Sequence, residues 1–145
     1  MIKFNRLYAC VAVLLATTLC GCGGQQPADP APVAEEETLA RTEFTERVEN
    51  FFEYVPLKAN KPSFFRIHLT DLLDGTPVEK AEVTLTARPA GSSQAAAETT
   101  AKIGKVTGIY VADLTIMQPG TYDIEFHIKN AKLDERLPLR DFKVE

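Results

Sequence analysis

Hydrophobic and polar residues alternate along most of the chain beyond residue 50, in short segments that turn-forming residues separate. A period of two is typical of β-strands that bury one face, and frequent turns are typical of all-β proteins. The pattern therefore predicts an all-β domain. Four segments have the clearest apolar faces: Phe65, Ile67 and Leu69; Val83, Leu85 and Ala87; Tyr110, Ala112, Leu114 and Ile116; and Tyr122, Ile124, Phe126 and Ile128.

Turn sequences stand between these segments. Gly75 lies in the sequence Asp-Gly-Thr-Pro, and Gly120 lies in the sequence Gln-Pro-Gly-Thr. Glycine adopts positive φ without the steric cost of a side chain. Both glycines are therefore expected to have structural roles in their turns.

Weaker patterns predict three further strands. They cover about residues 51–57, 95–102 and 136–144. In the last of them the apolar positions change side, which predicts a bulge or a bend near Pro138. The total is about seven strands, each apolar on one face.

Strands of this kind bury their apolar faces when two sheets pack against each other, which predicts a β-sandwich. Tyr122 follows Pro-Gly-Thr and looks like the tyrosine corner of immunoglobulin-like domains, in which the phenol bonds to upstream backbone. The expected fold is therefore an immunoglobulin-like or fibronectin-III-like sandwich, without the cysteine pair of antibody domains.

The first residues have the features of an export signal. Lys3 and Arg6 precede an apolar stretch over residues 7–19, which is short for a membrane-spanning helix. The sequence Leu-Cys-Gly-Cys that follows resembles a bacterial lipoprotein processing site. Cys22 is the expected lipidated residue, because a small residue precedes it, and Cys20 is the alternative. An unprocessed signal anchor or an ordinary signal peptide remains a further interpretation.

This interpretation divides the chain into three parts. Residues 1–21 are the expected signal peptide, residues 22–45 the lipid anchor and a disordered tether, and residues 46–145 the sandwich domain. The tether is rich in Pro, Ala and acidic residues and poor in large apolar residues, so it cannot form a core. Residues 38–50 have an imperfect helical spacing, for which a short helical turn is expected.

Length and charge narrow the possible functions. The 145 residues suffice for one ordinary domain. The chain has 16 Lys and Arg against 20 Asp and Glu; removal of Lys3 and Arg6 with the signal leaves 14 cations and a net charge of −6. Nucleic acid is not an expected partner, because binding its phosphates requires clustered cations.

Few residues suggest chemistry. All three cysteines, Cys10, Cys20 and Cys22, precede the predicted domain. Asp71 and Asp74 flank a turn and are expected to form it. The sequence therefore predicts no enzyme and no cofactor.

Metal binding is the other chemistry to consider, and only two histidines are available for it. His68 and His127 are weak candidate metal ligands on polar faces of their strands, and in an immunoglobulin-like order they belong to opposite sheets. The two side chains are therefore not expected to share a metal ion.

Residues 45–83 resemble the N-terminal β domain of periplasmic adaptor subunits of RND-type efflux pumps, particularly the heavy-metal branch. The most specific match is Phe-Arg-Ile-His-Leu-Thr-Asp-Leu over residues 65–72, followed by Asp-Gly-Thr-Pro-Val over residues 74–78. Further shared features are an acidic and aromatic strand over 49–54, a Pro-containing turn over 56–62, and the later motifs over 108–110 and 119–122.

The resemblance implies a function in the bacterial envelope. Adaptors of this family continue into lipoyl-like and membrane-proximal domains, to which nothing in this sequence corresponds. The expectation is therefore a lipid-anchored, non-catalytic accessory domain on the periplasmic side, with efflux pump components as partners. Gly23 after Cys22 weakly favours the outer membrane. The alternatives are a weak metal-binding module that uses the surface histidines and a split remnant of a full-length adaptor.

Overall fold

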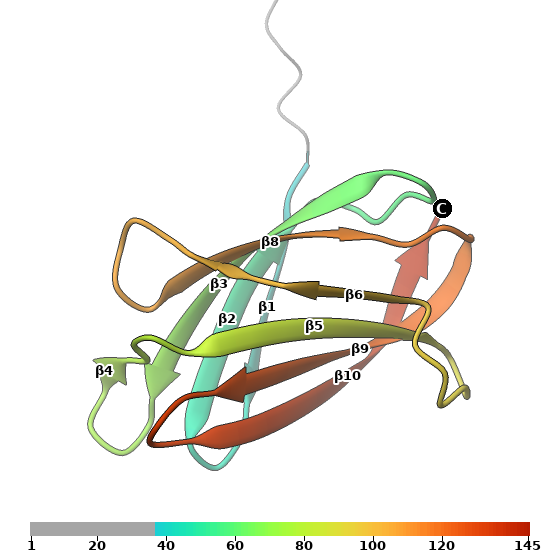
Figure 1. The fold of residues 1–145 in the computed structure, drawn as a ribbon. Coiled ribbons are helices and arrows are strands. Elements are labelled where there is room, and N and C mark those ends of the chain that lie inside the picture. Colours follow the sequence, from blue (N-terminus) through green and yellow to red (C-terminus); the bar gives the residue numbers. More distant parts are fainter. Residues whose placement is uncertain (1–36) are drawn as a thin grey trace, which may run out of the picture. The chain divides into compact units, whose positions relative to one another are not determined.

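The computed structural model describes residues 37–145, and these residues form an all-β structure of two antiparallel sheets (Figure 1). The expected signal peptide, Cys22 and most of the expected tether lie outside the described residues. No helix capable of crossing a membrane occurs in the described part of the chain. The strands are β1 (Leu39–Phe44), β2 (Val48–Tyr54), β3 (Pro62–Asp71), β4 (Thr76–Pro77), β5 (Glu82–Pro89), β6 (Ala97–Thr100), β7 (Lys102–Ile103), β8 (Ile109–Thr115), β9 (Gly120–Lys129) and β10 (Asp134–Val144).

The two sheets have different strand orders. The first sheet has the order β1-β2-β3-β8-β7, with β4 paired to the end of β3, and the second has the order β10-β9-β5-β6. The chain therefore passes from the first sheet to the second between β4 and β5, returns between β6 and β7, and crosses again between β8 and β9. These crossings join the sheets into one unit.

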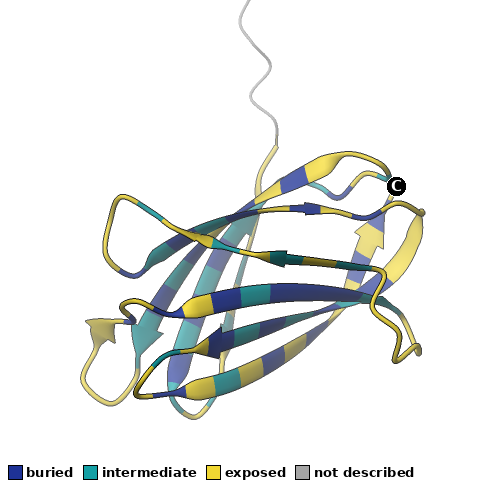
Figure 2. Ribbon diagram, viewed as in Figure 1, coloured by how far each residue is buried: buried dark blue, intermediate teal, exposed yellow. Residues whose placement is uncertain are grey.

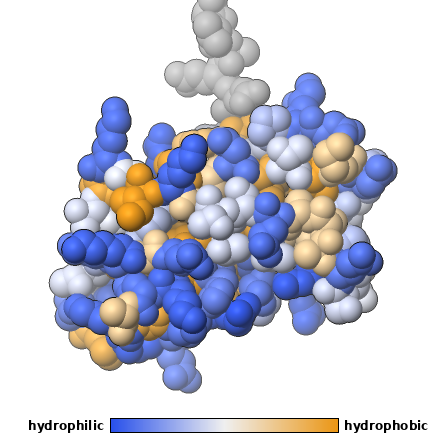
Figure 3. All heavy atoms as spheres, in the orientation of Figure 1, coloured by the Kyte–Doolittle hydropathy of each residue, from blue (hydrophilic) through white to orange (hydrophobic). Residues whose placement is uncertain are grey.

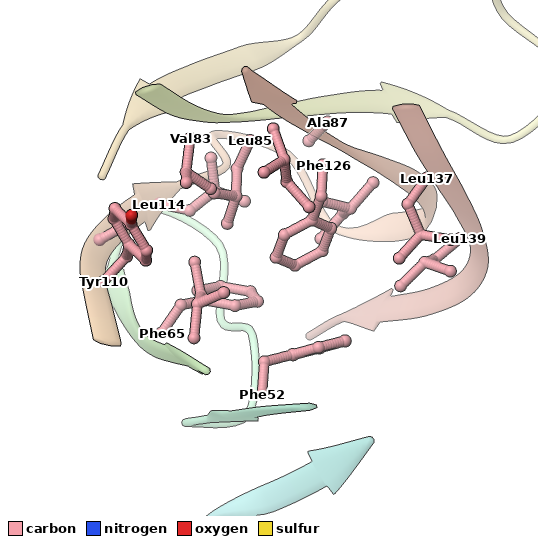
Figure 4. Close-up of a cluster of buried hydrophobic side chains, with 14 of the residues drawn as sticks. Phe52, Phe65, Val83, Leu85, Ala87, Tyr110, Leu114, Phe126, Leu137 and Leu139 are labelled. Atoms are coloured by element: carbon pink, nitrogen blue, oxygen red, sulfur yellow. The ribbon is translucent and has the colours of Figure 1, made fainter. Parts of the chain in front are cut away.

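The alternation seen in the sequence places one face of each long strand in a common core (Figure 2). All apolar positions of the four clearest segments are buried, as predicted. Phe52 of the first sheet and Phe126 of the second have ring centroids 4.8 Å apart. Figure 4 shows side chains of both sheets directed toward one another. The arrangement is consistent with a β-sandwich, because the apolar faces of the two sheets share one core.

The expected helical turn over residues 38–50 is wrong. Residues 39–44 form β1 and residues 48–54 form β2, and the two strands make an antiparallel hairpin. The last residues assigned to the tether are thus part of a sheet. Helical spacing was a weak signal here, and pairing with β2 supplies the backbone hydrogen bonds that an isolated segment of this length lacks.

The structure has ten strands where about seven were predicted. β1 and β4 were not predicted, and the tenth strand arises because one predicted strand corresponds to two in the structure. The polar segment over 95–102 divides between β6 and β7, which belong to different sheets. Burial patterns do not reveal such a division, because both short strands are largely exposed.

The predicted irregularity in the last strand is present, but it lies after Pro138. The register of β10 against β9 shifts between Leu139 and Phe142, and Asp141 has φ of 67°. Pro138 keeps its place opposite Glu125. An edge strand tolerates proline because one side of its backbone needs no partner.

Candidate functional site

Several connections between strands meet at one end of the described structure, which we call the loop end. It comprises the turn over 45–47, the connection over 72–81, the turn over 104–108 and the turn over 130–133. Backbone and side-chain hydrogen bonds join them: Leu72 N–H donates to Arg47 O (2.8 Å), Leu69 N–H donates to Gly108 O (2.9 Å), and Asn130 Nδ2 donates to Glu79 O (3.0 Å). The C-terminus lies at the opposite end, to the right in Figure 1.

The turn between β3 and β4 is organised by two carboxylates. Asp71 accepts a hydrogen bond from Leu73 N–H (3.0 Å) and forms an ion pair with Arg47 (3.1 Å). Asp74 accepts hydrogen bonds from the backbone N–H (3.0 Å) and the hydroxyl (2.6 Å) of Thr76. The bonds of the two carboxylates to nearby backbone were predicted from the sequence, whereas the contacts with the Arg47 side chain and the Thr76 hydroxyl were not.

Both carboxylates have pKa values below the ordinary one. The hydrogen bond from the Leu73 backbone is the main cause for the lowered pKa of Asp71, and the Arg47 side chain adds to it. The hydrogen bond from the Thr76 hydroxyl is the main cause for the lowered pKa of Asp74. Each carboxylate is therefore held in its charged form as part of the turn.

Two hollows flank this turn. The first has a volume of about 510 Å³ and lies between the 71–80 segment and the turn over 130–133. Its charged lining has both signs: Asp71, Asp74, Glu79, Lys80 and Lys132. A site with mixed charge suits a polar surface of a partner better than a single ion of either sign.

The second hollow has a volume of about 220 Å³ and lies on the other side of Pro77. His68, Thr107 and Gly108 are among its lining residues. Gly108 has φ of 79°, and a Cβ atom at this position would come within 2.6 Å of Pro77 Cβ. The close approach of the 104–108 turn to β4 therefore depends on glycine.

The histidines occupy different sheets, as the sequence suggested. His68 is on β3, where its ring packs edge-on against Phe51 with centroids 5.3 Å apart. The Nε2 atom of His68 is buried and has no hydrogen-bond partner among the described residues.

His127 is on β9, and its Nε2 lies 2.6 Å from Asp134 Oδ1. This contact is the main cause of the lowered pKa of Asp134, and Lys129 at 3.2 Å contributes as well. Within residues 37–145, no group of three or more His, Cys, Asp or Glu side chains is arranged to hold a metal ion. The two histidines therefore have separate surroundings, one apolar and one charged.

Two tyrosines of the core form hydrogen bonds with the backbone of connections between strands. Tyr122 Oη donates to Gln118 O (3.0 Å), four residues upstream, which is the type of contact expected of a tyrosine corner. Tyr110 is 1% exposed; its hydroxyl donates to Val78 O (2.8 Å) and accepts from Ala81 N–H (3.0 Å). The sequence predicted Tyr110 only as a core residue. The alternation of apolar and polar residues indicates which face of a strand is buried, but it does not indicate which groups a buried hydroxyl contacts.

Four of the eight exposed large apolar side chains of the described residues lie at the loop end. Phe44, Leu72, Leu73 and Val106 are 59%, 43%, 72% and 60% exposed; Phe44 ends β1, and the other three come from two connections. Elsewhere, the face shown in Figure 3 is mainly hydrophilic, with separate hydrophobic areas. Sequence reasoning missed this feature, since the four residues are scattered along the chain.

Comparison with known proteins gives little further information. No family model matches the chain, and no curated protein matches it. A solved structure titled "ZirS C-terminal Domain" is similar, with 14% sequence identity and a TM-score of 0.41. The similarity covers 96% of this chain and 86% of that one.

Proposed function

We propose that this chain is a lipid-anchored, non-catalytic binding domain of the bacterial cell envelope, and that it contacts a protein partner through its loop end. The observation that carries the proposal is that Phe44, Leu72, Leu73 and Val106 are exposed at the same end as the two hollows, one of which Val106 lines. Apolar side chains rimmed by charged groups are typical of protein contact sites. The carboxylates nearby already serve the turn, which favours binding over acid–base chemistry.

The proposed fold type is immunoglobulin-like. The orders β2-β3-β8-β7 and β10-β9-β5-β6 match the strand orders A-B-E-D and G-F-C of immunoglobulin domains, with β6 beside strand C and β1 added outside strand A. The hydrogen bond from Tyr122 at the start of β9 supports the same assignment, because the tyrosine corner belongs to strand F. In this assignment, the loop end corresponds to the end that antibody variable domains use for binding.

The proposed partner is a component of an RND-type efflux assembly, particularly of the heavy-metal type. This part of the proposal rests on the resemblance of residues 45–83 to the adaptor β domain. The proposed location is the periplasmic side of the envelope, with the outer membrane weakly favoured.

The anchor is tested by substitution of each candidate cysteine. Cys22→Ser is expected to abolish incorporation of a labelled fatty acid and to release the protein from the membrane fraction, because the thiol is the acylated atom. Cys20→Ser is the matched control and is expected to retain both. Release by Cys20→Ser with retention by Cys22→Ser would place the anchor at the other cysteine.

The binding surface is tested by a photo-crosslinking amino acid at Leu73, with Met117 as the control. Both side chains are well exposed, at 72% and 56%, but Met117 follows β8 at the end away from the loops. Illumination of intact cells is expected to capture a pump, an adaptor or an outer channel from Leu73 and much less from Met117. Capture of another envelope protein from Leu73 would support the loop end as a binding surface but would reject the efflux pump as its partner. Equal capture from both positions would reject the binding surface.

The second candidate function is weak metal binding, which the buried and unpartnered Nε2 atom of His68 favours. Titration of Zn²⁺ into the wild-type protein, His68→Ala and His127→Ala separates the candidates. Binding that disappears only in His68→Ala would support a site at that residue. Equal weak binding of Zn²⁺ by all three proteins would exclude a metal site at His68 or His127.

A further inference from the structure

β1 contributes less to the core than any other long strand of the described structure. It has no buried residue, whereas every other described strand of six or more residues has several. It lies at the edge of the first sheet and pairs only with β2. Segments with few buried apolar contacts and exposed backbone hydrogen bonds open at a lower free energy than the whole fold. β1 is therefore the long strand most able to leave the sandwich by itself.

One residue of β1, Arg41, contacts the second sheet. Its Nη1 atom donates to Arg140 O of β10 (3.2 Å), and its guanidinium carbon lies 4.9 Å from the centre of the Phe142 ring. Glu43 Oε1 orients the guanidinium by accepting from Nε (3.1 Å) and Nη2 (2.6 Å). A guanidinium over an aromatic face adds a cation–π attraction to the hydrogen bond. No other side chain of β1 forms a hydrogen bond or an ion pair with a described residue of the second sheet.

The bulge in β10 supplies the acceptor for Arg41. The register of β10 against β9 is interrupted between Leu139 and Phe142, where Asp141 has φ of 67°. Arg140 lies within this interruption, so its carbonyl group is available to the side chain of Arg41. The irregularity of the last strand is thus the place where the edges of the two sheets are joined.

β1 also covers an aromatic side of the core. Leu39 is opposite Tyr54 in the register with β2, and Arg41 lies over Phe142. The rings of Tyr54 and Phe142 have centroids 5.6 Å apart, and they lie 5.9 and 6.4 Å from the Phe52 ring. Departure of β1 would remove the cover of these rings and the partner of the β2 backbone.

We propose that β1 is a strap that opens as a unit while the rest of the sandwich stays folded, and that Arg41 holds the closed strap to β10. Opening uncovers the edge of β2, which then has free backbone groups of the kind that a strand of another protein can pair with. The strap is independent of the proposed function and of the loop end.

The backbone of β2 provides a way to detect the opening. Val55 N–H, just after β2, donates to Phe64 O of β3 (3.1 Å), and Val48 O accepts from Thr45 N–H on the side of β1 (2.9 Å). Backbone groups of a strand alternate between its two neighbours. The odd-numbered residues of β2 therefore bond to β3, and the even-numbered residues bond to β1.

Amide hydrogen exchange of the full chain, purified in detergent and followed for each residue at urea concentrations below the unfolding transition, tests the strap. The Phe52 amide bonds to β1, so it is expected to exchange through strap opening at a rate that hardly depends on urea, because little surface is exposed. The Phe51 amide bonds to β3. It is expected to exchange more slowly, with the steep urea dependence of unfolding of the whole domain.

Substitution of Arg41 tests what holds the strap closed. Arg41→Ala is expected to raise the urea-independent exchange rate of Phe52 about tenfold, because opening no longer breaks the contacts with Arg140 and Phe142. Arg66→Ala is the matched control, since the ion pair of Arg66 with Glu53 (3.5 Å) joins β3 to β2 and does not involve β1. It is expected to leave this rate unchanged.

A disulfide provides the opposite change. Ala40 and Glu53 are opposed in a pair without mutual hydrogen bonds, and the Cα atoms of such pairs lie about 4.5 Å apart, within disulfide reach. In the chain with Ala40→Cys and Glu53→Cys, oxidation is expected to abolish the urea-independent exchange of Phe52. Reduction of the same chain is expected to restore it.

Three results would overturn the proposal. A common rate and a common urea dependence for Phe51 and Phe52 would show that β1 does not open separately. Equal effects of Arg41→Ala and Arg66→Ala would reject Arg41 as the residue that holds the strap. Urea-independent exchange of Phe52 that persists in the oxidised chain would show that its amide is exposed by a motion other than strap opening.

Discussion

Tyr110 is a core residue with a polar group that has two partners. Tyr110→Phe keeps the ring and removes the hydroxyl, which leaves Val78 O and Ala81 N–H without their hydrogen bonds in a buried place. We expect the free energy of unfolding to fall by about 1–3 kcal/mol, as for other losses that leave buried groups unpaired. Urea denaturation measures the change.

Tyr122→Phe is the matched control for this prediction. Its hydroxyl makes one hydrogen bond, in a partly buried position, so we expect a smaller loss of about 0.5–1.5 kcal/mol. An equal or larger loss in Tyr122→Phe would show that the two bonds of Tyr110 do not stabilise the connection between the sheets.

Gly108 and Gly91 have nearly the same backbone conformation but different surroundings. Their φ values are 79° and 78°; a Cβ atom would clash with Pro77 at Gly108, whereas it would meet nothing within 4 Å at Gly91. Gly91→Ala is expected to cost about 1 kcal/mol for the backbone alone, and Gly108→Ala about 2–4 kcal/mol because overpacking adds to it. Thermal or urea unfolding of both variants checks this difference, and equal losses would exclude a role for the contact with Pro77.

At the scale of elements, the turn between β3 and β4 and the start of β10 contain carboxylates that make the free energy of unfolding depend on pH in the acid range. The pKa values of Asp71, Asp74 and Asp134 are lower in the folded protein than the ordinary value of 3.8. A lowered carboxylate pKa contributes stability above the unfolded value, and this contribution is lost as the pH falls through the folded value. We expect the free energy of unfolding to decrease from about pH 4 downward.

Asp74→Asn isolates one of these groups. The amide oxygen still accepts the hydrogen bonds from Thr76, but the side chain no longer titrates, so the decrease in stability below pH 4 is expected to be less steep. Asp113→Asn is the control, because the Asp113 side chain is exposed and forms no hydrogen bond or ion pair with a side chain of the described residues. Urea denaturation at several pH values gives both slopes. Equal slopes for Asp74→Asn and the wild type would contradict the prediction.

The hairpin of β1 and β2 shows where element prediction from sequence fails. Val48, Asn50 and Phe52 face the core, yet Asn50 interrupts the apolar pattern and both polar atoms of its side chain lack a described partner. β1 itself has no buried residue. β1 is a strand because it pairs with β2, and the hydrophobic pattern of its own sequence does not indicate this pairing.

At the scale of the whole molecule, stability depends on contact between the sheets. Phe52 and Phe126 are both fully buried and pack across the two sheets. Phe52→Ala is expected to lower the free energy of unfolding by about 3–5 kcal/mol, because it leaves a cavity in this contact. Phe44→Ala, at 59% exposure, is the control and is expected to change it by less than about 0.5 kcal/mol. Chemical denaturation compares the two, and a small loss in Phe52→Ala would show that the sheets do not depend on this contact.

The sequence by itself determined the strands with one apolar and one polar face, because side chains of a strand alternate regardless of what covers it. It also predicted the turns at Asp74 and Gly75, where local hydrogen bonds and backbone freedom act within a few residues. Separate sheets for His68 and His127 followed from the strand order that the sequence suggested.

Only the tertiary structure decided the features that depend on residues far apart in the chain. These are the pairing of β1, the two bonds of the Tyr110 hydroxyl, the two hollows, and the apolar side chains gathered at the loop end. Local sequence determines which way a side chain faces, whereas its neighbours depend on how the sheets cross and pack. For this reason the sequence predicted the core well and the candidate binding surface hardly at all.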